Sequence, residues 1–136
     1  IHNDGHAGNL LRSGPDSDLA TGVIDFGDLV RTVTAADVGI SGANLVPHQV
    51  DPVAALAALT AGFHSRQPLS ESEIDTIPEL VLCRLALSTL LVEHQIATAP
   101  HIADAVAEEL PGLLAGTERW LTLDPARITE QIREAL

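Results

Sequence analysis

The residues best suited to chemistry lie in two short stretches near the start of this 136-residue chain. The first reads His2-x-Asp4-x-x-x-x-Asn9, and the second is Asp25-Phe26-Gly27. In phosphoryl transfer, the Asp of an H-x-D-x-x-x-x-N loop accepts the proton of the attacking hydroxyl. The Asn of that loop and the Asp of a following D-F-G hold Mg²⁺, which prefers hard oxygen ligands. We therefore expect Asp4 to be the catalytic base, and Asn9 and Asp25 to hold Mg²⁺ on the phosphates of ATP or GTP.

A predicted β-hairpin would bring the two stretches together. Residues 10–11 begin an apolar strand, residues 13–18 are turn formers, and residues 21–24 form a returning strand that is mostly β-branched or apolar. In an antiparallel pair, the beginning of one strand lies beside the end of the other. Asn9, just before the hairpin, and Asp25, just after it, should therefore lie side by side.

Two other interpretations of these residues must be weighed. Asx side chains cap turns in most proteins, so Asp4 or Asn9 taken alone could be an ordinary turn residue. The alternation of His2, Asp4 and His6 also suggests a metallohydrolase site, with imidazole ligands and a metal-bound water. Such sites normally recruit further ligands from distant strands, and few candidates are available here. The ordered set of motifs across one hairpin favours the phosphoryl-transfer interpretation, and leaves the roles of His6 and Asp28 open.

The motif pair resembles the C-terminal lobe of the aminoglycoside phosphotransferase and choline kinase-like family, small-molecule relatives of the protein kinases. That family shows H-[GN]-D-x-x-x-x-N followed by [IV]-D-[FW]-[GE], and residues 2–9 and 24–27 match both patterns. The resemblance implies a protein-kinase-like fold and transfer of a phosphoryl group to a small-molecule hydroxyl. It also implies supporting roles for His2, which would hold the loop backbone, and for Asp37, which would pack under the catalytic loop.

A closer similarity is to the phosphotransferase domain of hydroxylysine kinase-type proteins. It extends beyond the motif pair to residues 68–88, which follow a "PL…E…P.LV..RL..S" pattern. In some of those proteins the domain is fused ahead of a class III aminotransferase. The similarity therefore implies a possible fused aminotransferase domain as a partner of this chain.

Composition narrows the choice of partner and compartment. A formal net charge of −12 argues against nucleic acid, because a phosphate backbone requires a basic surface. The same charge favours a cationic small-molecule substrate, although an acidic surface also serves solubility. The single Cys83 sits in an apolar run, where a buried thiol is expected, and it allows no internal disulfide; this fits a cytoplasmic setting. The apolar run 80–92 is interrupted by Arg84 and too short to span a bilayer, so no membrane is expected.

The rest of the chain has helical signals. We expect a helix over residues 37–46 and a second one that begins at Asp51-Pro52, an N-cap followed by proline at N1. Ser70 and Glu73 fit a capping box. A short helix there should give way near Pro78 to a long core helix that ends at about residue 97. The polar Arg84 inside that helix needs a partner, for which Glu79, Ser88 or a carboxylate elsewhere could serve.

Two further helices are expected towards the C-terminus. One spans residues 101–121 and is bent at Pro111-Gly112, and the last begins at Asp124-Pro125. Trp120 is expected to be a packing anchor. The predicted fold class is mainly α with one small β-hairpin.

Two absences define the predicted domain. The chain contains no methionine, and all seven of its basic residues other than histidine are arginine, whereas a kinase needs a phosphate-binding lysine in its N-terminal lobe. We therefore expect residues 1–136 to be a C-terminal lobe whose N-terminal lobe is missing. Residues 1–37 would carry the catalytic loop, hairpin and D-F-G segment, and residues 38–136 a helical subdomain.

Such a fragment should be inactive alone. It should also expose apolar surface that could make a homodimer or a domain swap. The alternative function is a non-catalytic, kinase-shaped binding or regulatory module of a larger metabolic protein.

Overall fold

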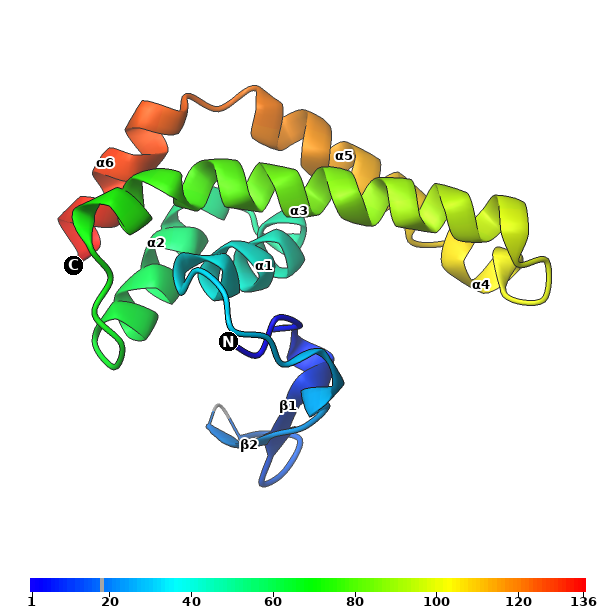
Figure 1. Ribbon diagram of the computed structural model, residues 1–136, viewed down its shortest axis with the longest axis horizontal. Helices are drawn as coiled ribbons and strands as arrows, with labels where there is room; N and C mark the ends of the chain where they lie inside the picture. Colours follow the sequence, from blue (N-terminus) through cyan, green and yellow to red (C-terminus); the bar gives the residue numbers. More distant parts are fainter. Residues whose placement is uncertain (18) are drawn as a thin grey trace.

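The computed structural model describes residues 1–17 and 19–136, and these are mostly helical with one two-stranded antiparallel sheet. Figure 1 shows a helical body from which the hairpin projects on the side of α1. In chain order the elements are η1 (Ala7–Asn9), β1 (Leu10–Arg12), β2 (Ala20–Val23), η2 (Phe26–Asp28), α1 (Ala35–Leu45), η3 (Val46–His48), α2 (Pro52–His64), α3 (Glu71–Thr98), α4 (Ala103–Ala107), α5 (Leu110–Leu121) and α6 (Pro125–Ala135), the η elements being short 3₁₀ turns.

The predicted hairpin is confirmed. Leu10 of β1 lies opposite Val23 of β2, and a β-bulge follows between Leu11 and Arg12. Beyond the last strand pair, the Ile24 amide donates to the Asn9 carbonyl at 3.0 Å. The open end of the hairpin therefore joins the end of the first motif to the start of the second.

The helical body is assembled on α3. This helix packs against α1, α5 and α6, and Figure 1 shows it running across the whole body. Ile77, Val81 and Leu85 recur every four residues along α3 and are fully buried, so they form the stripe that faces the other helices. A β-carbon at Gly39 of α1 would lie 2.5 Å from the Leu80 Cβ, which shows how closely α1 crosses α3.

The helix starts predicted from Asp51, Ser70 and Asp124 are confirmed, whereas the helix predicted over residues 37–46 begins at Ala35. The Asp51 carboxylate accepts a 3.0 Å hydrogen bond from an amide in the first turn of α2. At α3 the Ser70 Oγ accepts from the Glu73 amide, and the Glu73 carboxylate accepts from the Ser70 amide, which completes the capping box. Asp124 caps α6 in the same way as Asp51 caps α2.

The predicted change of helix at Pro78 is wrong, because α3 runs unbroken from Glu71 to Thr98. Proline removes one donor from the helical ladder, but packing of the apolar stripe of α3 maintains the helix through this position. The Pro78 carbonyl also accepts a 3.1 Å hydrogen bond from the indole nitrogen of Trp120. Trp120 is buried and is therefore the packing anchor that the sequence predicted.

Two other expectations about the helical body also need correction. The helix predicted over residues 101–121 is two helices, α4 and α5, and Pro111 lies in the first turn of α5, where proline is favoured. Cys83 is exposed, because it lies off the stripe formed by Val81 and Leu85.

The apolar part of α3 is also longer than the run 80–92. The 28-residue helix is long and apolar enough to cross a membrane by length and composition. In this structure the same helix packs against α1, α5 and α6 as the centre of the body.

Candidate active site

The first motif forms a loop held from below by α1. Asp37, in the first turn of α1, accepts the Asn3 amide on Oδ1 at 3.0 Å and the His2 amide on Oδ2 at 3.4 Å. Gly5 follows in the loop, and a β-carbon there would lie 2.0 Å from the Ser41 Oγ and 3.2 Å from its Cβ, so a larger residue would force Ser41 to move. The carboxylate of Asp37 and the close approach at Gly5 fix the loop on α1.

The side chain of Asn9 locks the position of Asp4. Its Nδ2 donates to the Asp4 carbonyl at 2.9 Å and to the Asp4 Oδ2 at 3.0 Å. Because both bonds use the amide nitrogen, the orientation of the buried Asn9 amide is determined. Its Oδ1 accepts no hydrogen bond from residues 1–17 or 19–136 and remains a free oxygen ligand. An amide oxygen of this kind suits Mg²⁺.

Two further side chains surround the Asp4 carboxylate. The His6 Nε2 lies 3.4 Å from Oδ2, and the Arg84 Nη2 lies 3.6 Å from Oδ1. The His6 Nδ1 accepts the Gly8 amide at 3.1 Å, so the neutral imidazole carries its proton on Nε2, toward Asp4. Arg84 comes from α3, and its partner is the third of the predicted candidates, a carboxylate elsewhere in the chain. Sequence reasoning signalled that Arg84 needed a partner but did not identify Asp4.

Asp25 begins the second loop in a strained backbone conformation. Its φ of 61° and ψ of 70° lie in the left-handed region, and Asn3 in the first loop has a φ of 68°. These are the two non-glycine residues with positive φ in the described part of the chain. Backbone strain of this kind concentrates at functional sites. The Asp25 side chain is exposed directly after Ile24, the residue that hydrogen-bonds to Asn9, so it can approach a ligand shared with Asn9.

His2 connects the two loops. Its Nε2 lies 3.0 Å from the Ile24 carbonyl, to which it can donate, and its ring meets the Phe26 ring edge-on with centroids 5.3 Å apart. These contacts join the first loop to the second, and the loop-holding role that the resemblance implied stays a prediction. They give no support to a metallohydrolase site. Nowhere in residues 1–17 and 19–136 do three His, Cys, Asp or Glu side chains gather in a way that could hold a metal.

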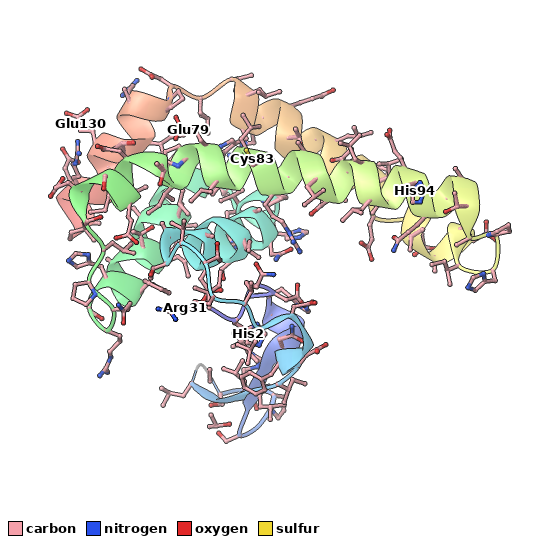
Figure 2. The ribbon with its side chains drawn as sticks, in the orientation of Figure 1. His2, Arg31, Glu79, Cys83, His94 and Glu130 are labelled. Carbon is pink, nitrogen blue, oxygen red and sulfur yellow. The ribbon has the colours of Figure 1, made fainter. Side chains whose placement is uncertain are left out.

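Two other residues, His94 and Asp28, are not among the contacts of Asp4 described above. Figure 2 shows His94 near the far end of α3, whereas His2 lies on the hairpin side of the molecule. Asp28 ends η2, and its side chain is exposed. The structure therefore brings together Asp4, Asn9, His6 and Arg84, with Asp25 on the adjoining loop.

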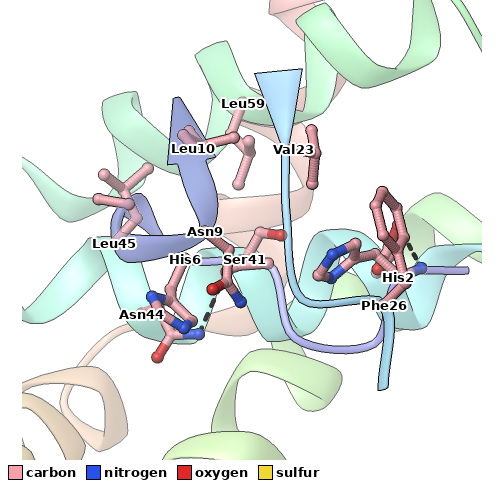
Figure 3. Close-up of a pocket in the computed structure, with 13 residues that line it drawn as sticks. His2, His6, Asn9, Leu10, Val23, Phe26, Ser41, Asn44, Leu45 and Leu59 are labelled. Atoms are coloured by element: carbon pink, nitrogen blue, oxygen red, sulfur yellow. Dashed lines mark hydrogen bonds between the residues drawn. The ribbon is translucent and has the colours of Figure 1, made fainter. Parts of the chain in front are cut away.

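A cavity of about 600 Å³ lies between the hairpin, the catalytic loop, α1 and α2 (Figure 3). Its walls are mainly apolar and its polar groups come from the loop and from α1. At that polar edge the Asn44 amide nitrogen donates to the Gly5 carbonyl at 3.2 Å. The lining residues are His2, Gly5, His6, Ala7, Asn9, Leu10, Val23, Phe26, Asp37, Ser41, Asn44, Leu45 and Leu59.

Sequence comparisons identify a family and relatives of this chain. The sequence model of the phosphotransferase enzyme family matches residues 1–74. Viomycin phosphotransferase from Streptomyces vinaceus is 36% identical over 99 residues, which cover 71% of this chain and 32% of that protein. Hydroxylysine kinase from Danio rerio is 28% identical over 101 residues, which cover 73% of this chain and 28% of that protein.

No solved structure matches this chain. The aligned residues span less than a third of the length of either curated relative. The family resemblance inferred from the motifs is confirmed, and the chain belongs to the phosphotransferase enzyme family.

Proposed function

We propose that the protein containing this chain transfers the γ-phosphoryl group of ATP or GTP to a hydroxyl of a small, amine-bearing molecule. The observation that carries the proposal is the arrangement of Asn9, whose nitrogen holds the Asp4 carboxylate while its oxygen stays free. Membership of the phosphotransferase enzyme family supports the reaction class. The net charge of −12 supports a cationic acceptor, because an acidic protein attracts cations.

In this mechanism Asp4 orients the acceptor hydroxyl and takes its proton. The hydroxyl oxygen forms a bond to the γ-phosphorus while the bond between that phosphorus and the β,γ-bridging oxygen breaks, so the nucleoside diphosphate leaves. Asn9 Oδ1 and the Asp25 carboxylate would hold Mg²⁺, which neutralises charge on the phosphate oxygens when bound. His2 and Asp37 keep the two loops in place. Positioning and charge neutralisation supply most of the rate enhancement.

We also propose that residues 1–136 form the C-terminal lobe of a kinase-like domain. A kinase site needs a lysine that contacts the nucleotide phosphates, and this chain contains none. The curated relatives are more than three times as long as the segments that align with this chain. On this proposal the N-terminal lobe supplies the remaining nucleotide contacts, and the 136-residue chain alone does not turn over substrate.

The test is release of nucleoside diphosphate by the full-length protein with Mg²⁺ and a panel of acceptors. The panel contains amino alcohols and aminoglycosides. It also contains viomycin and hydroxylysine, because the two relatives are named for these compounds. We expect turnover with at least one amine-bearing alcohol and a loss of about 10²-fold or more in Asp4→Asn.

Turnover that is unchanged in Asp4→Asn would contradict the role of Asp4. Absence of turnover with every acceptor and both nucleotides would favour the non-catalytic binding module instead.

A further inference from the structure

Among residues 1–17 and 19–136, Arg84 is the one hydrogen-bond or ion-pair partner of the Asp4 carboxylate that comes from outside the His2–Asn9 loop. We propose that Arg84 is a positioning residue, which fixes the plane of the Asp4 carboxylate for proton transfer. The inference rests on the proposed function, because it assigns Arg84 a task only if Asp4 is the catalytic base. Arg84 lies outside the two catalytic motifs and outside the family match to residues 1–74, although it is the arginine of the pattern noted over residues 68–88.

The contacts of Asp4 divide between its two oxygens. Asn9 Nδ2 and His6 Nε2 both lie nearest Oδ2, at 3.0 and 3.4 Å. A carboxylate held through one oxygen can still rotate about its Cβ–Cγ bond. Arg84 Nη2 pairs with Oδ1 at 3.6 Å, an ion-pair distance, so its charge opposes this rotation from the side of the second oxygen. Two held oxygens define a plane, and alignment of a general base with its proton depends on that plane.

The backbone that carries Arg84 is anchored in the core. Its neighbours on α3, Val81 and Leu85, are fully buried in the core. The Arg84 side chain is 26% exposed, and its Nε is buried without a hydrogen-bond partner among the described residues. A polar atom buried in this way raises the free energy of the folded state. The terminal nitrogen of Arg84 faces Asp4, whereas its buried Nε cannot be reached by a ligand.

Other arginines in the chain have contacts of a different kind. Arg119 donates to the backbone carbonyls of Gln49 and Val50, and so fastens α5 to the turn before α2. Arg133 pairs with Glu71 and Asp75 on the surface. In the described part of the chain, neither of them forms a hydrogen bond or ion pair with the His2–Asn9 loop. Arg119 thus offers a matched control, an arginine that links two other segments.

The test compares Arg84→Gln, Arg84→Lys and Arg119→Gln in the full-length protein. We expect Arg84→Gln to lower kcat by about 10- to 100-fold with little change in the acceptor KM, because a misaligned base slows the chemical step and leaves binding intact. Arg84→Lys should recover part of the loss, since it restores a positive charge without the planar fork. Arg119→Gln should keep the wild-type kcat.

Two kinetic results would overturn the inference. One is an unchanged kcat in Arg84→Gln when the wild-type protein is active. The other is a raised acceptor KM at constant kcat, which would make Arg84 a binding residue for the acceptor.

A second readout separates failure of this inference from failure of the proposed function. Thermal unfolding of Asp4→Asn, Arg84→Gln and the double variant measures whether the two side chains are coupled, and it needs no turnover. We expect Tm changes that are not additive. Additive changes would remove Arg84 from the neighbourhood of Asp4 even if the protein proves to be an active kinase.

Discussion

At the scale of single residues, Asn3 shows why the motif is written as it is. The family pattern allows glycine or asparagine between the histidine and the aspartate, and Asn3 has a φ of 68° in the structure. Glycine adopts this left-handed conformation freely, and asparagine tolerates it better than other side chains. The conformation turns the Asn3 amide onto Oδ1 of Asp37. The restriction of this motif position to glycine or asparagine is therefore explained by the left-handed backbone conformation that the position adopts.

This conformation predicts a selective effect of substitution at position 3. Asn3→Gly should leave the free energy of unfolding within about 0.5 kcal/mol of the wild type, whereas Asn3→Val should lower it by about 1–2 kcal/mol. Chemical denaturation of both variants measures the difference. Equal stabilities would mean that position 3 does not adopt the left-handed conformation.

The spacing of Asp4, Asn9 and Asp25 alone was enough to predict them as site residues, and the structure adds the hydrogen bonds between Asn9 and Asp4. The sequence could not identify the contact between Arg84 and Asp4. That contact depends on how α3 packs on α1 and on which face of α3 turns toward the loop, and both depend on many distant side chains. Periodicity predicts a buried face of a helix, but it does not predict which distant element covers a given position.

At the scale of elements, the crossing of α1 over α3 positions the loop relative to Arg84. Asp37 and Gly39 lie on the same short helix, so the contact that holds the loop and the contact with α3 are close together. A side chain at Gly39 would meet the Leu80 Cβ at 2.5 Å and the Leu80 backbone carbon at 3.2 Å. A larger residue there must push α1 away from α3.

Gly39→Ala should therefore lower the free energy of unfolding by about 1–3 kcal/mol, as is usual for an overpacked core. Gly62→Ala is the matched control, because Gly62 lies within α2 and a β-carbon there meets nothing within 4 Å. The control should raise stability by about 0.5–1 kcal/mol, since alanine favours helix. Urea denaturation compares the two variants, and equal effects would contradict the close crossing.

The capping box of α3 predicts a pH dependence. Hydrogen bonds from the Ser70 backbone and side chain lower the pKa of Glu73 from its ordinary value of 4.5. Because its pKa is lower in the folded state, Glu73 contributes its full stabilisation at pH values above its unfolded-state pKa. That stabilisation is lost as the pH falls through the folded-state pKa. Glu73→Gln should therefore be less stable than the wild type by about 0.5 kcal/mol near pH 7, the size expected for an exposed charge at a helix N-terminus.

The difference between Glu73→Gln and the wild type should shrink below pH 4.5 and vanish once Glu73 is protonated in the folded protein. Thermal unfolding of both proteins between about pH 3 and pH 7, a range that covers ordinary carboxyl titration, measures this difference in stability. A difference that stays constant over this range would exclude a charge effect.

Helix starts were the most predictable elements, because caps and first-turn prolines act locally. Asp51, Ser70 and Asp124 all cap the helices that the sequence assigned to them. The continuity of α3 through Pro78 was not predictable in the same way. It depends on tertiary packing, and the Trp120 indole that bonds to the Pro78 carbonyl lies 42 residues further along the chain.

At the scale of the whole molecule, the hairpin segment differs from the helical body. The body has a continuous core on α3, whereas large apolar side chains between residues 10 and 33 are exposed. An isolated two-stranded hairpin is at best marginally stable in water. We expect this surface to contact the remainder of the polypeptide. The exposed residues are Leu10, Leu11, Leu19, Val23, Ile24, Phe26, Leu29, Val30 and Val33.

On the proposed function, the site performs two separate tasks, proton acceptance by Asp4 and metal–nucleotide binding by Asn9 and Asp25. The most direct measurement is calorimetric binding of Mg·ATP to the full-length protein and its Asp4→Asn and Asp25→Asn variants, with turnover measured in parallel. Asp25→Asn should weaken Mg·ATP binding by about 10-fold or more, because a ligand carboxylate is lost. Asp4→Asn should bind Mg·ATP as the wild type does while turnover falls by about 10²-fold or more. Unchanged Mg·ATP binding in Asp25→Asn, together with unchanged turnover in Asp4→Asn, would contradict the assignment of both tasks.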